Sequence, residues 1–330
     1  MANILILGAG SMGTAFSYPC SDNNHNVSII GTHLENEFID QINSHKRHPI
    51  LDTDIPKNVK FLKLENLEEE IKKKVDLVVI AVIAKGIEWA SLELSKVLKY
   101  DIPILILTKG LSINKNNYEI LVHKMERILK KNGIKHINIS AAGGPCLAKG
   151  LAQKVHTSVV FANAKIEIAN QIKKLVSTDY YHVSTTDDVI GVEVCAAIKN
   201  IFSMAVGSTE DLNTAAALIK QSIDEMVIFT QKLNGRKETV MGLAGIGDLY
   251  VSADGGRNSK MGKFLGQGMS FKEAKQKKMQ NDTVEGADLV MEIGNMVKKD
   301  FDLETLPLMI GVIETICDEK KLKIRWEKFN

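Results

Sequence analysis

Cysteine is scarce in this chain and follows no pattern that metal or redox chemistry would use. The 330 residues include 4 cysteines, none of which forms a CxxC pair, and no HExxH is present. Their spacing is typical of neither a zinc site nor a disulfide framework, and His45 and His48 are the one close pair of histidines. We therefore expect no metal site. A chain without disulfides suits a reducing compartment, so we predict that the protein is cytoplasmic.

The sequence also lacks a hydrophobic run long enough to cross a membrane. The longest apolar stretch, residues 75–84, contains Asp76. It is far shorter than the ~20 residues that a spanning helix needs. No positively charged segment precedes the first apolar residues, so we expect no signal peptide. These absences predict a protein without a membrane span.

An excess of one charge is missing as well. Lys and Arg number 42 against 40 for Asp and Glu, a formal net charge of +2, and the basic residues occur in short separate runs. Proteins that bind nucleic acid through its phosphates need a basic surface. We therefore expect no nucleic-acid partner, although a local anion site is compatible with this balance.

The sequence does contain a regular alternation of short apolar runs with segments of helical period. With 330 residues, of which 45% are hydrophobic, it is long enough for two domains. The apolar runs are rich in Ile, Leu and Val, which is typical of strands buried on both faces. Helices are expected from about residue 11 and over 34–43 and 87–98. The expected strands are residues 3–7, 27–30, 59–62, 77–82, 104–107, 137–141, 159–162 and 180–184.

The strand signal stops after about Val189. Helical patterns follow over residues 190–212, 215–233, 258–266, 285–298 and 306–319. Strands that alternate with helices predict a parallel sheet with right-handed crossovers. We therefore predict an α/β protein whose N-terminal Rossmann-type domain, residues 1–189, has a doubly wound and mostly parallel sheet. An all-α substrate-binding domain, residues 190–330, follows it.

The first motif that carries chemistry is the GxGxxG of Gly8–Gly13. It follows the expected strand 3–7 directly and opens a helix, which is the context that dinucleotide binding requires. Gly8 would make the tight turn, Gly10 would let the backbone approach a pyrophosphate, and Gly13 would let the helix pack on the strand. The helix N-terminus would supply N–H groups and positive dipole to the phosphates.

The acidic residue that usually follows this motif by about 20 positions is not cleanly present. The second strand ends in Gly31-Thr32-His33, and Glu35 comes too far along to be expected at a ribose. Thr32 and His33 are compatible with a ribose or with a 2′-phosphate. The choice between NAD and NADP stays open, and we expect both to be accepted with at most a modest preference.

Further candidates follow the ends of later strands. Lys109, in Thr108-Lys109-Gly110, lies where ligands bind in open α/β sheets, beyond a strand's carboxyl end. The plainer alternative is a solvated loop lysine. Gly143-Gly144-Pro145-Cys146 follows another strand and is also placed for close backbone approach.

The helical half contains a lysine in an apolar helix and an arginine after glycines. Lys199 is surrounded by apolar residues, and a lysine is almost never buried unless it is paired or functional. Its side chain could instead reach out to solvent. Asp248 follows Gly247, and Arg257-Asn258 follows Gly255-Gly256 at the start of an expected helix. Guanidinium geometry and helix dipole together favour a phosphate there.

With these residues in view, the chain resembles the NAD(P)-dependent glycerol-3-phosphate dehydrogenase family, in its bacterial type. The resemblance runs from Gly8 to the region of Glu285. The matching segments, in the family's order and at its spacings, are residues 8–15, 108–110, 199–200, 247–249, 256–258 and 284–286.

The resemblance implies an oxidoreductase that interconverts dihydroxyacetone phosphate and sn-glycerol 3-phosphate by hydride transfer with NAD(H) or NADP(H). It implies that Lys199 transfers the proton and is the catalytic residue. The implied substrate-binding residues are Lys109, Lys199, Asp248, Gly256, Arg257 and Asn258. The turn glycines and the implied positions together give the cofactor-binding set Gly8, Gly10, Ser11, Met12, Gly13, His33, Lys109, Ala148, Arg257, Thr283 and Glu285.

The chain departs from the family pattern around the cofactor and the substrate mouth. Met12 stands where an aromatic residue is usual, Ile83 where proline is usual, and Cys146-Leu147 where Ser or His precedes Phe or Tyr. Lys199 and the residues implied for the substrate phosphate, Arg257 and Asn258, match the family pattern. The exact polyol stays open. The alternatives are a dehydrogenase of another phosphorylated polyol, a 2-hydroxy-acid or 6-phosphogluconate type of relative, and a dinucleotide-binding sensor without turnover. A homodimer also stays open.

Overall fold

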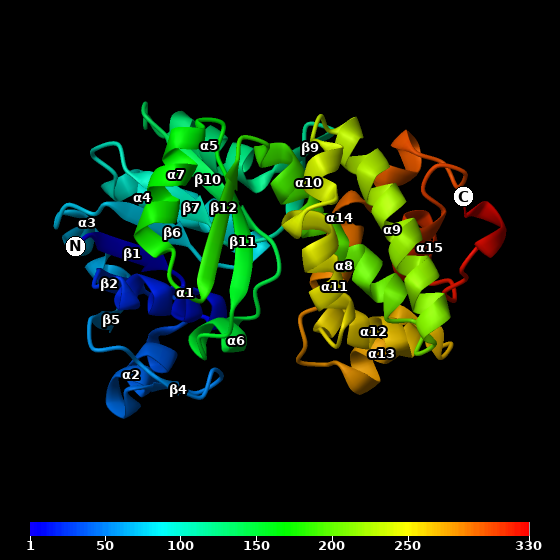
Figure 1. Cartoon of the computed structure of the whole chain (residues 1–330), viewed down its shortest axis with the longest axis horizontal. Coiled ribbons are helices and arrows are strands. Elements are labelled where there is room, and N and C mark those ends of the chain that lie inside the picture. Colours follow the sequence, from blue (N-terminus) through cyan, green and yellow to red (C-terminus); the bar gives the residue numbers. More distant parts are fainter. Residues whose placement is uncertain (330) are drawn as a thin grey trace. The chain divides into compact units, whose positions relative to one another are not determined.

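The structure is a computed structural model and describes residues 1–329. The chain forms two compact units. The first unit comprises residues 1–109 and 121–189, and the second comprises residues 110–120 and those from Ile190 onward. Figure 1 shows the first unit in blue to green and the second mainly in green to red. The sequence did not predict that residues 110–120 belong to the second unit.

An eight-stranded sheet forms the middle of the first unit, in the order β12-β11-β10-β7-β6-β1-β2-β5. Every neighbouring pair is parallel except β10 with β11. From β5 to β10 this is the strand order 3-2-1-4-5-6 of a Rossmann fold, which confirms the predicted fold class. The strands are β1 (Asn3–Leu7), β2 (Asn26–Ile30), β5 (Val59–Leu62), β6 (Leu77–Ile80), β7 (Pro103–Ile106), β10 (Asn138–Gly143), β11 (Thr157–Ala162) and β12 (Tyr181–Thr186).

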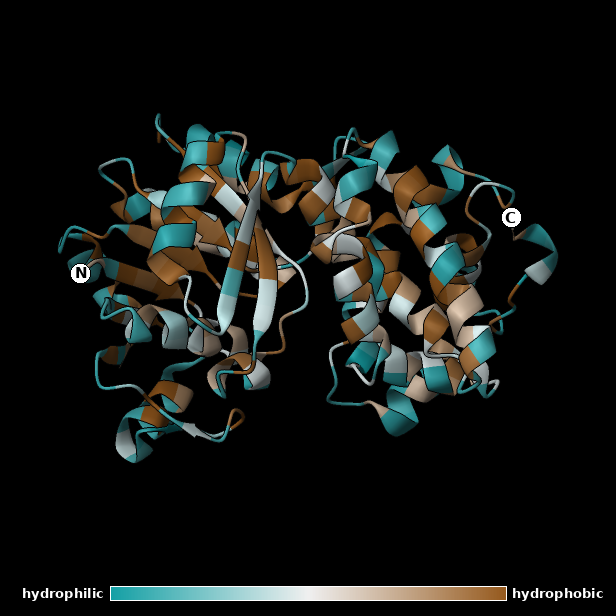
Figure 2. Cartoon of the chain, in the orientation of Figure 1, coloured by the Kyte–Doolittle hydropathy of each residue, from teal (hydrophilic) through white to brown (hydrophobic). Residues whose placement is uncertain are grey.

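The helices of the first unit turn apolar faces toward the sheet. In α5 the buried side chains of Leu121, Met125 and Ile128 recur at intervals of four and three residues, which places them on one face. Figure 2 shows central strands in brown and the outer faces of helices in teal. The helices are α1 (Ser11–Asp22), α2 (Asn36–His45), α3 (Leu67–Ile71), α4 (Ile87–Val97), α5 (Leu121–Lys131), α6 (Ala148–Ala152) and α7 (Ile166–Val176), and the pair β3 (Arg47–His48) and β4 (Thr53–Asp54) follows α2.

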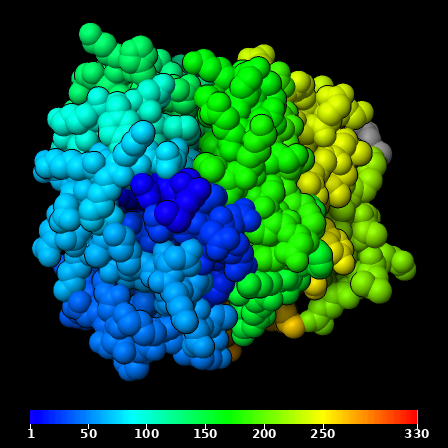
Figure 3. Space-filling view, turned by 60° about the vertical axis from the view of Figure 1, so that its left-hand side comes forward, coloured from blue at the N-terminus to red at the C-terminus, as the bar shows by residue number. Residues whose placement is uncertain are grey.

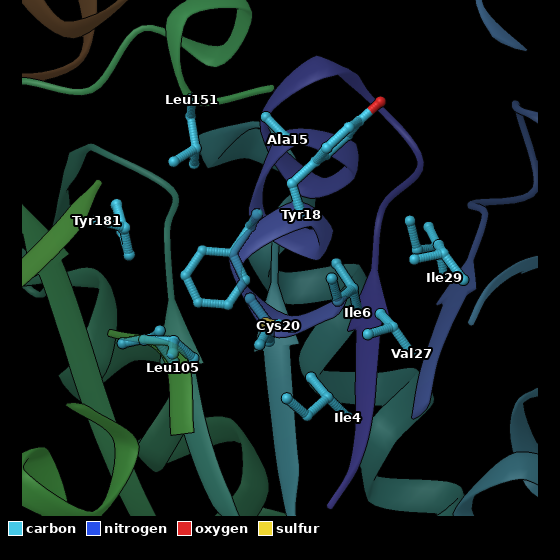
Figure 4. Packing of buried hydrophobic residues seen from close by; sticks show 14 of the residues in the cluster. Ile4, Ile6, Ala15, Tyr18, Cys20, Val27, Ile29, Leu105, Leu151 and Tyr181 are labelled. Carbon is cyan, nitrogen blue, oxygen red and sulfur yellow. The ribbon is translucent and has the colours of Figure 1, made fainter. Parts of the chain in front are cut away.

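Side chains from several strands and helices form the core of this unit, among them β1, β2, β7, β12, α1 and α6 (Figure 4). Ile6 of β1 and Ile29 of β2 are fully buried, and the ring of Phe16 in α1 meets that of Tyr181 edge to face at 6.1 Å. Full burial of a side chain of this size contributes about 1.5–3 kcal/mol. The core therefore fixes α1, and with it the glycine turn that precedes the helix.

Polar contacts hold the C-terminal end of α1. The side-chain amide of Asn23 donates to the carbonyl oxygens of Leu175 (2.8 Å) and Ser177 (3.0 Å). The hydroxyl of Tyr180 donates to the Asp22 carboxylate at 2.7 Å, and burial together with that carboxylate raises the pKa of Tyr180. In Figure 3 the blue residues of this region border the green residues of the later chain. Helix α1 is thus anchored along its length.

The second unit consists of helices and one β-hairpin. The hairpin is β8 (Leu111–Asn114) with β9 (Asn117–Ile120). From residue 189 to 329 the described elements are all helical, as expected. The helices are α8 (Val189–Val206), α9 (Leu212–Lys232), α10 (Lys237–Val240), a π-helical turn (Leu243–Gly247), α11 (Asp248–Ala253), α12 (Arg257–Gly266), α13 (Phe271–Lys278), α14 (Glu285–Asp300) and α15 (Pro307–Cys317).

Helix α8 is the central helix of this unit and differs from its expected extent. It ends at Val206 rather than at residue 212, because Asp211 caps a new helix by accepting the backbone N–H of Thr214 at 2.8 Å. By length and composition α8 is also apolar enough to cross a membrane, but 94% of it is buried inside the protein. That burial is typical of the core helix of a globular unit.

A buried carboxylate joins α9 to α15. Glu225 is fully buried, and its two oxygens accept the backbone N–H groups of Leu308 (2.7 Å) and Met309 (2.8 Å) at the N-terminus of α15. The amide of Gln221 donates a third hydrogen bond at 3.0 Å. Burial raises the pKa of Glu225 to about 7, against the lowering effect of these hydrogen bonds.

This pKa predicts how Glu225→Gln changes stability with pH. The folded state binds the proton more tightly than an unfolded chain, whose glutamate pKa is about 4.3, so this carboxylate's contribution falls as the pH rises from about 4 to 7. Glutamine does not titrate and turns an amide donor toward a helix N–H group, at a cost of about 1–3 kcal/mol. Urea unfolding should show the variant less stable than wild type at pH 5, with a smaller difference at pH 8. A difference that stays constant would contradict the shifted pKa.

Candidate active site

The turn between β1 and α1 lies where the strand order of the sheet reverses. Leu7 at the end of β1 pairs in register with Ile80 at the end of β6, and residues 8–13 follow directly. A Cβ on Gly13 would lie 2.2 Å from the carbonyl oxygen of Gly8 and 2.9 Å from the Cβ of Ala81. Helix α1 can therefore approach β1 and β6 this closely only because Gly13 has no side chain.

Gly10, in contrast to Gly13, has no close neighbours where a side chain would be. No atom lies within 4 Å of the position that its Cβ would take, so open space faces the backbone at the N-terminus of α1. Gly10 is the N-cap of this helix, no side chain caps it, and Ser11 and Met12 are its first, partly exposed residues. Unsatisfied N–H groups and the helix dipole favour an anion at such a position. The turn therefore fits a dinucleotide pyrophosphate.

Glu35 lies much closer to this turn than its position in the sequence suggested. One oxygen of its carboxylate accepts the backbone N–H of Thr32 at 2.7 Å and that of Ala9 at 3.2 Å. Whether Glu35 reaches a ribose stays untested, but the turn after β2 reverses the chain and directs its side chain back to the glycine loop.

The other predicted residues of the first unit lie near the carboxyl ends of the strands. Lys109 follows β7, and its ammonium group donates to the carbonyl oxygen of Gly144, beyond β10, at 3.3 Å. Ala148 is the first residue of α6 and is partly buried. His33 is exposed, with its ring 5.4 Å from that of Trp89. Lys109 thus contacts a second strand end, rather than being a solvated loop lysine alone.

In the second unit, Lys199 and Asp248 form a buried ion pair. The lysine is 6% exposed and the aspartate 2%, and 3.0 Å separates Nζ from Oδ1. A buried charge is expensive unless it is paired, and removing one partner of such a pair typically costs about 3–5 kcal/mol. The side chain of Lys199 therefore does not reach out to solvent, and the structure brings together two residues that are 49 positions apart.

Ser252 is a third member of this cluster, and the predicted site did not include it. Its hydroxyl oxygen accepts a hydrogen bond from the Lys199 ammonium group. Ser252 lies four residues after Asp248 in α11, so both side chains are on one helix face. That spacing is a signal in the sequence that could have identified it. The π-helical turn directly before Asp248 sets where α11 begins, and such irregularities are common at functional sites.

Arg257 and Asn258 begin α12, with Gly256 as its N-cap and no side chain capping it. Arg257 forms an ion pair with Glu285, and both side chains are well exposed, at 54% and 40%. The Asn258 amide is buried, donates to Oδ1 of Asn200 at 3.0 Å and accepts the backbone N–H of Gly286 at 2.9 Å. Asn258 therefore joins the start of α12 to α8 and α14.

The predicted residues of the second unit thus form a contiguous arrangement in the described structure. Arg257 and Glu285 are paired, Asn258 contacts the neighbour of Lys199, and Lys199 is paired with Asp248. Thr283 is exposed in the segment that leads into α14. The roles of these residues toward a substrate or cofactor stay predictions.

Comparison with known proteins extends over almost the whole chain. Residues 3–169 match the family described as NAD-dependent glycerol-3-phosphate dehydrogenase N-terminus, and residues 188–326 match its C-terminus. The NADP(+)-dependent glycerol-3-phosphate dehydrogenase of Archaeoglobus fulgidus is 32% identical over 282 residues, which cover 82% of each chain. The glycerol-3-phosphate dehydrogenase [NAD(P)+] of Oceanobacillus iheyensis is 29% identical over 330 residues, 98% of this chain and 92% of the relative.

Solved structures of glycerol-3-phosphate dehydrogenases have a similar fold. The glycerol-3-phosphate dehydrogenase of Coxiella burnetii matches with a TM-score of 0.83 at 24% identity, over 97% of this chain and 96% of that one. The enzyme of Plasmodium falciparum matches with a TM-score of 0.87 at 19% identity, over 99% and 95%. With both family regions matched and a relative above 30% identity along most of its length, the chain belongs to the NAD(P)-dependent glycerol-3-phosphate dehydrogenase family.

Proposed function

We propose the residues through which this chain, as a member of its family, interconverts dihydroxyacetone phosphate and sn-glycerol 3-phosphate with NAD(P)H. The observation that carries the assignment is the buried pair of Lys199 with Asp248, at 3.0 Å. Reduction of a ketone places negative charge on its oxygen, and a buried ammonium group is suited both to stabilise that charge and to donate a proton to it. In the reverse direction the amine form of Lys199 accepts the proton.

Asp248 and Ser252 position this lysine. A carboxylate 3.0 Å from Nζ favours the charged form of a lysine, and the hydroxyl of Ser252 accepts a second hydrogen bond from the same group. Both residues stand on α11, so the helix holds them at a fixed separation. When bound, a nicotinamide would supply the hydride in one direction and take it up in the other.

Arg257 and Asn258 are assigned to the substrate phosphate. The N-terminus of α12 offers backbone N–H groups, and a guanidinium group binds phosphate through two parallel hydrogen bonds. Glu285 now holds the guanidinium of Arg257, and a phosphate would compete with this carboxylate. Binding at the phosphate, remote from the reacting carbon, orients the ketone for reduction.

The glycine turn is assigned to the dinucleotide, with Ser11 and Met12 at the start of α1 and Lys109 beyond β7. This assignment rests on the open space at Gly10 and on the uncapped N-terminus of α1. The cytoplasmic location and a homodimer stay proposals. Among residues 1–329 no cysteine is in a disulfide, which supports a reducing compartment.

Gly10→Val tests the pyrophosphate position. The backbone of Gly10 is extended, with φ −64° and ψ 176°, and open space surrounds its Cβ position, so the variant should fold with nearly unchanged thermal stability. The new side chain fills the volume of the phosphates, and binding of NADH should be lost in a calorimetric titration. Unchanged affinity would show that the turn is only structural.

A pair of variants separates chemistry from stability at Lys199. Lys199→Met leaves the Asp248 carboxylate buried without its cation, so unfolding free energy should fall by about 3–5 kcal/mol. The kcat should fall about a hundredfold to ten-thousandfold, as is typical for the loss of a general acid. NADH affinity should stay unchanged, because the dinucleotide is assigned to the first unit.

The double variant Lys199→Met with Asp248→Asn removes both charges and is the matched control. It should regain much of the stability in a urea titration and none of the turnover. If the double variant recovers kcat, the lysine has only a structural role and the assignment is wrong.

Arg257→Ala tests the phosphate anchor. Hydrogen bonds to a charged group contribute about 1.5–3 kcal/mol, so KM for dihydroxyacetone phosphate should rise about ten- to hundredfold. The low activity on unphosphorylated dihydroxyacetone should change much less. Lys263→Ala removes a positive charge from the same helix about 9 Å further along and should leave both substrates unaffected. Equal losses on the two substrates in Arg257→Ala would refute the anchor.

A further inference from the structure

The segment between α13 and α14 carries part of the predicted site but has little backbone structure of its own. Residues 279–284, which we call the α13–α14 loop, lie in neither a helix nor a strand. A turn within the loop is closed by the N–H of Asp282, which donates to the carbonyl oxygen of Met279 at 3.2 Å. Thr283 lies in this loop, and Glu285 follows it as the first residue of α14. Whatever holds the loop therefore decides where these two predicted cofactor contacts lie.

The ammonium group of Lys275, in α13, holds this loop from inside. It donates to three backbone carbonyl oxygens of the loop, those of Met279 (2.7 Å), Gln280 (3.0 Å) and Asp282 (2.8 Å). An ammonium group has three N–H donors, so one loop takes up all of them. The loop thus closes around a positive charge as rings of carbonyl oxygens close around K⁺ in a channel filter.

Other contacts fix the ends of the loop more firmly than its middle. The side chains of Met279 and Val284, at the two ends, are buried. In between, the Asp282 carboxylate pairs with Lys260 of α12 at 3.0 Å, and both of these side chains are partly exposed. Ion pairs of this kind contribute about 0–1 kcal/mol. The conformation of the middle of the loop therefore depends mainly on Lys275.

We propose that Lys275 is a positioning residue for dinucleotide binding. Its ammonium group keeps the α13–α14 loop in the conformation that presents Thr283 and Glu285, the latter paired with Arg257. Lys275 acts through the loop and takes no part in the hydride or proton transfer. The proposal rests on the proposed function, and in particular on the prediction that Thr283 and Glu285 contact the cofactor.

The size of the effect follows from the population of the loop conformation. A ligand that binds one conformation of a loop loses apparent affinity in proportion to the time that the loop spends in others. If the loop without its cation keeps the binding conformation about a tenth of the time, the dissociation constant for NADH rises about tenfold. The reaction of bound cofactor should be little changed, because Lys199 and Asp248 lie on α8 and α11.

Lys275→Met tests this, since it removes the charge and keeps most of the apolar stem. In sodium chloride the dissociation constant for NADH, measured by calorimetry on the intact protein, should rise about tenfold. The kcat at saturating NADH and dihydroxyacetone phosphate should stay within about twofold of wild type. A lysine that only stabilises the fold would give the reverse pattern, with kcat lowered by loss of active protein and NADH affinity unchanged.

Ammonium ions supply the group that this variant lacks. Lys275 lines an open hollow of about 260 Å³ together with Phe271 and Met291, so an ion from solvent can reach the three carbonyl oxygens. Replacing sodium chloride with ammonium chloride should return the NADH dissociation constant of Lys275→Met to within about twofold of wild type. The same exchange should leave wild type unchanged, because its own ammonium group already fills the cage.

Lys277→Met is the matched control. It removes an equal charge from the same helix, and its ammonium group pairs with Glu273 at 2.7 Å rather than with the loop. This variant should keep the wild-type affinity for NADH in both salts. An unchanged affinity in Lys275→Met, an equal loss in Lys277→Met, or a loss in Lys275→Met that ammonium does not restore would each overturn the proposal.

A second variant serves if Lys275→Met does not fold. Lys275→Arg keeps the charge, but a guanidinium group directs its N–H donors outward in a rigid planar fork and cannot converge on three carbonyl oxygens. The same loss of NADH affinity is expected, and an unchanged affinity would contradict the proposal. A wild type that binds no NADH would overturn the dinucleotide site itself, whereas the results above, with wild-type binding intact, overturn only the role of Lys275.

Discussion

The rest of the second unit depends on the buried ion pair between Lys199 and Asp248. Neither charge is stable at that depth without the other, so α8 and α11 are held in one relative position. Asn258 then ties the start of α12 to α8, through Asn200, and to α14. The lysine assigned to proton transfer and the helix end assigned to the substrate phosphate are thereby held in place by the same packing, before any substrate arrives.

In the first unit, a different constraint also holds a helix N-terminus where an anion can bind. There the close approach of α1 to β1 and β6 requires a residue without a side chain at Gly13, and the resulting turn presents the uncapped end of α1. Both units thus offer a glycine-capped helix N-terminus to an anion. One is assigned to a pyrophosphate and the other to the phosphate of a small substrate. Glu35 places a negative charge beside the first of these ends.

Much of the fold was predictable because strands buried on both faces leave continuous apolar runs in the sequence. The β8–β9 hairpin was not, since its strands are short and the backbone N–H of Ile113 contacts Glu292, 179 residues away. In the candidate site, motif order predicted Lys199, Asp248 and Arg257, and their roles stay predictions. Ser252 could have been found from its four-residue helical spacing to Asp248. The contact of Glu35 with the glycine turn was not predicted, because distance along the chain says little about the reach of a side chain after a tight turn.

We conclude that the chain is a reductase of a three-carbon phosphorylated ketone, and we propose Lys199 as its proton donor. The most direct test follows NADH oxidation by the intact protein against a panel of phosphorylated ketones. The account predicts the highest kcat/KM with dihydroxyacetone phosphate and one molecule of sn-glycerol 3-phosphate formed for each NADH consumed. Tight NADH binding with no turnover of any phosphorylated ketone would contradict it and would indicate a dinucleotide sensor instead.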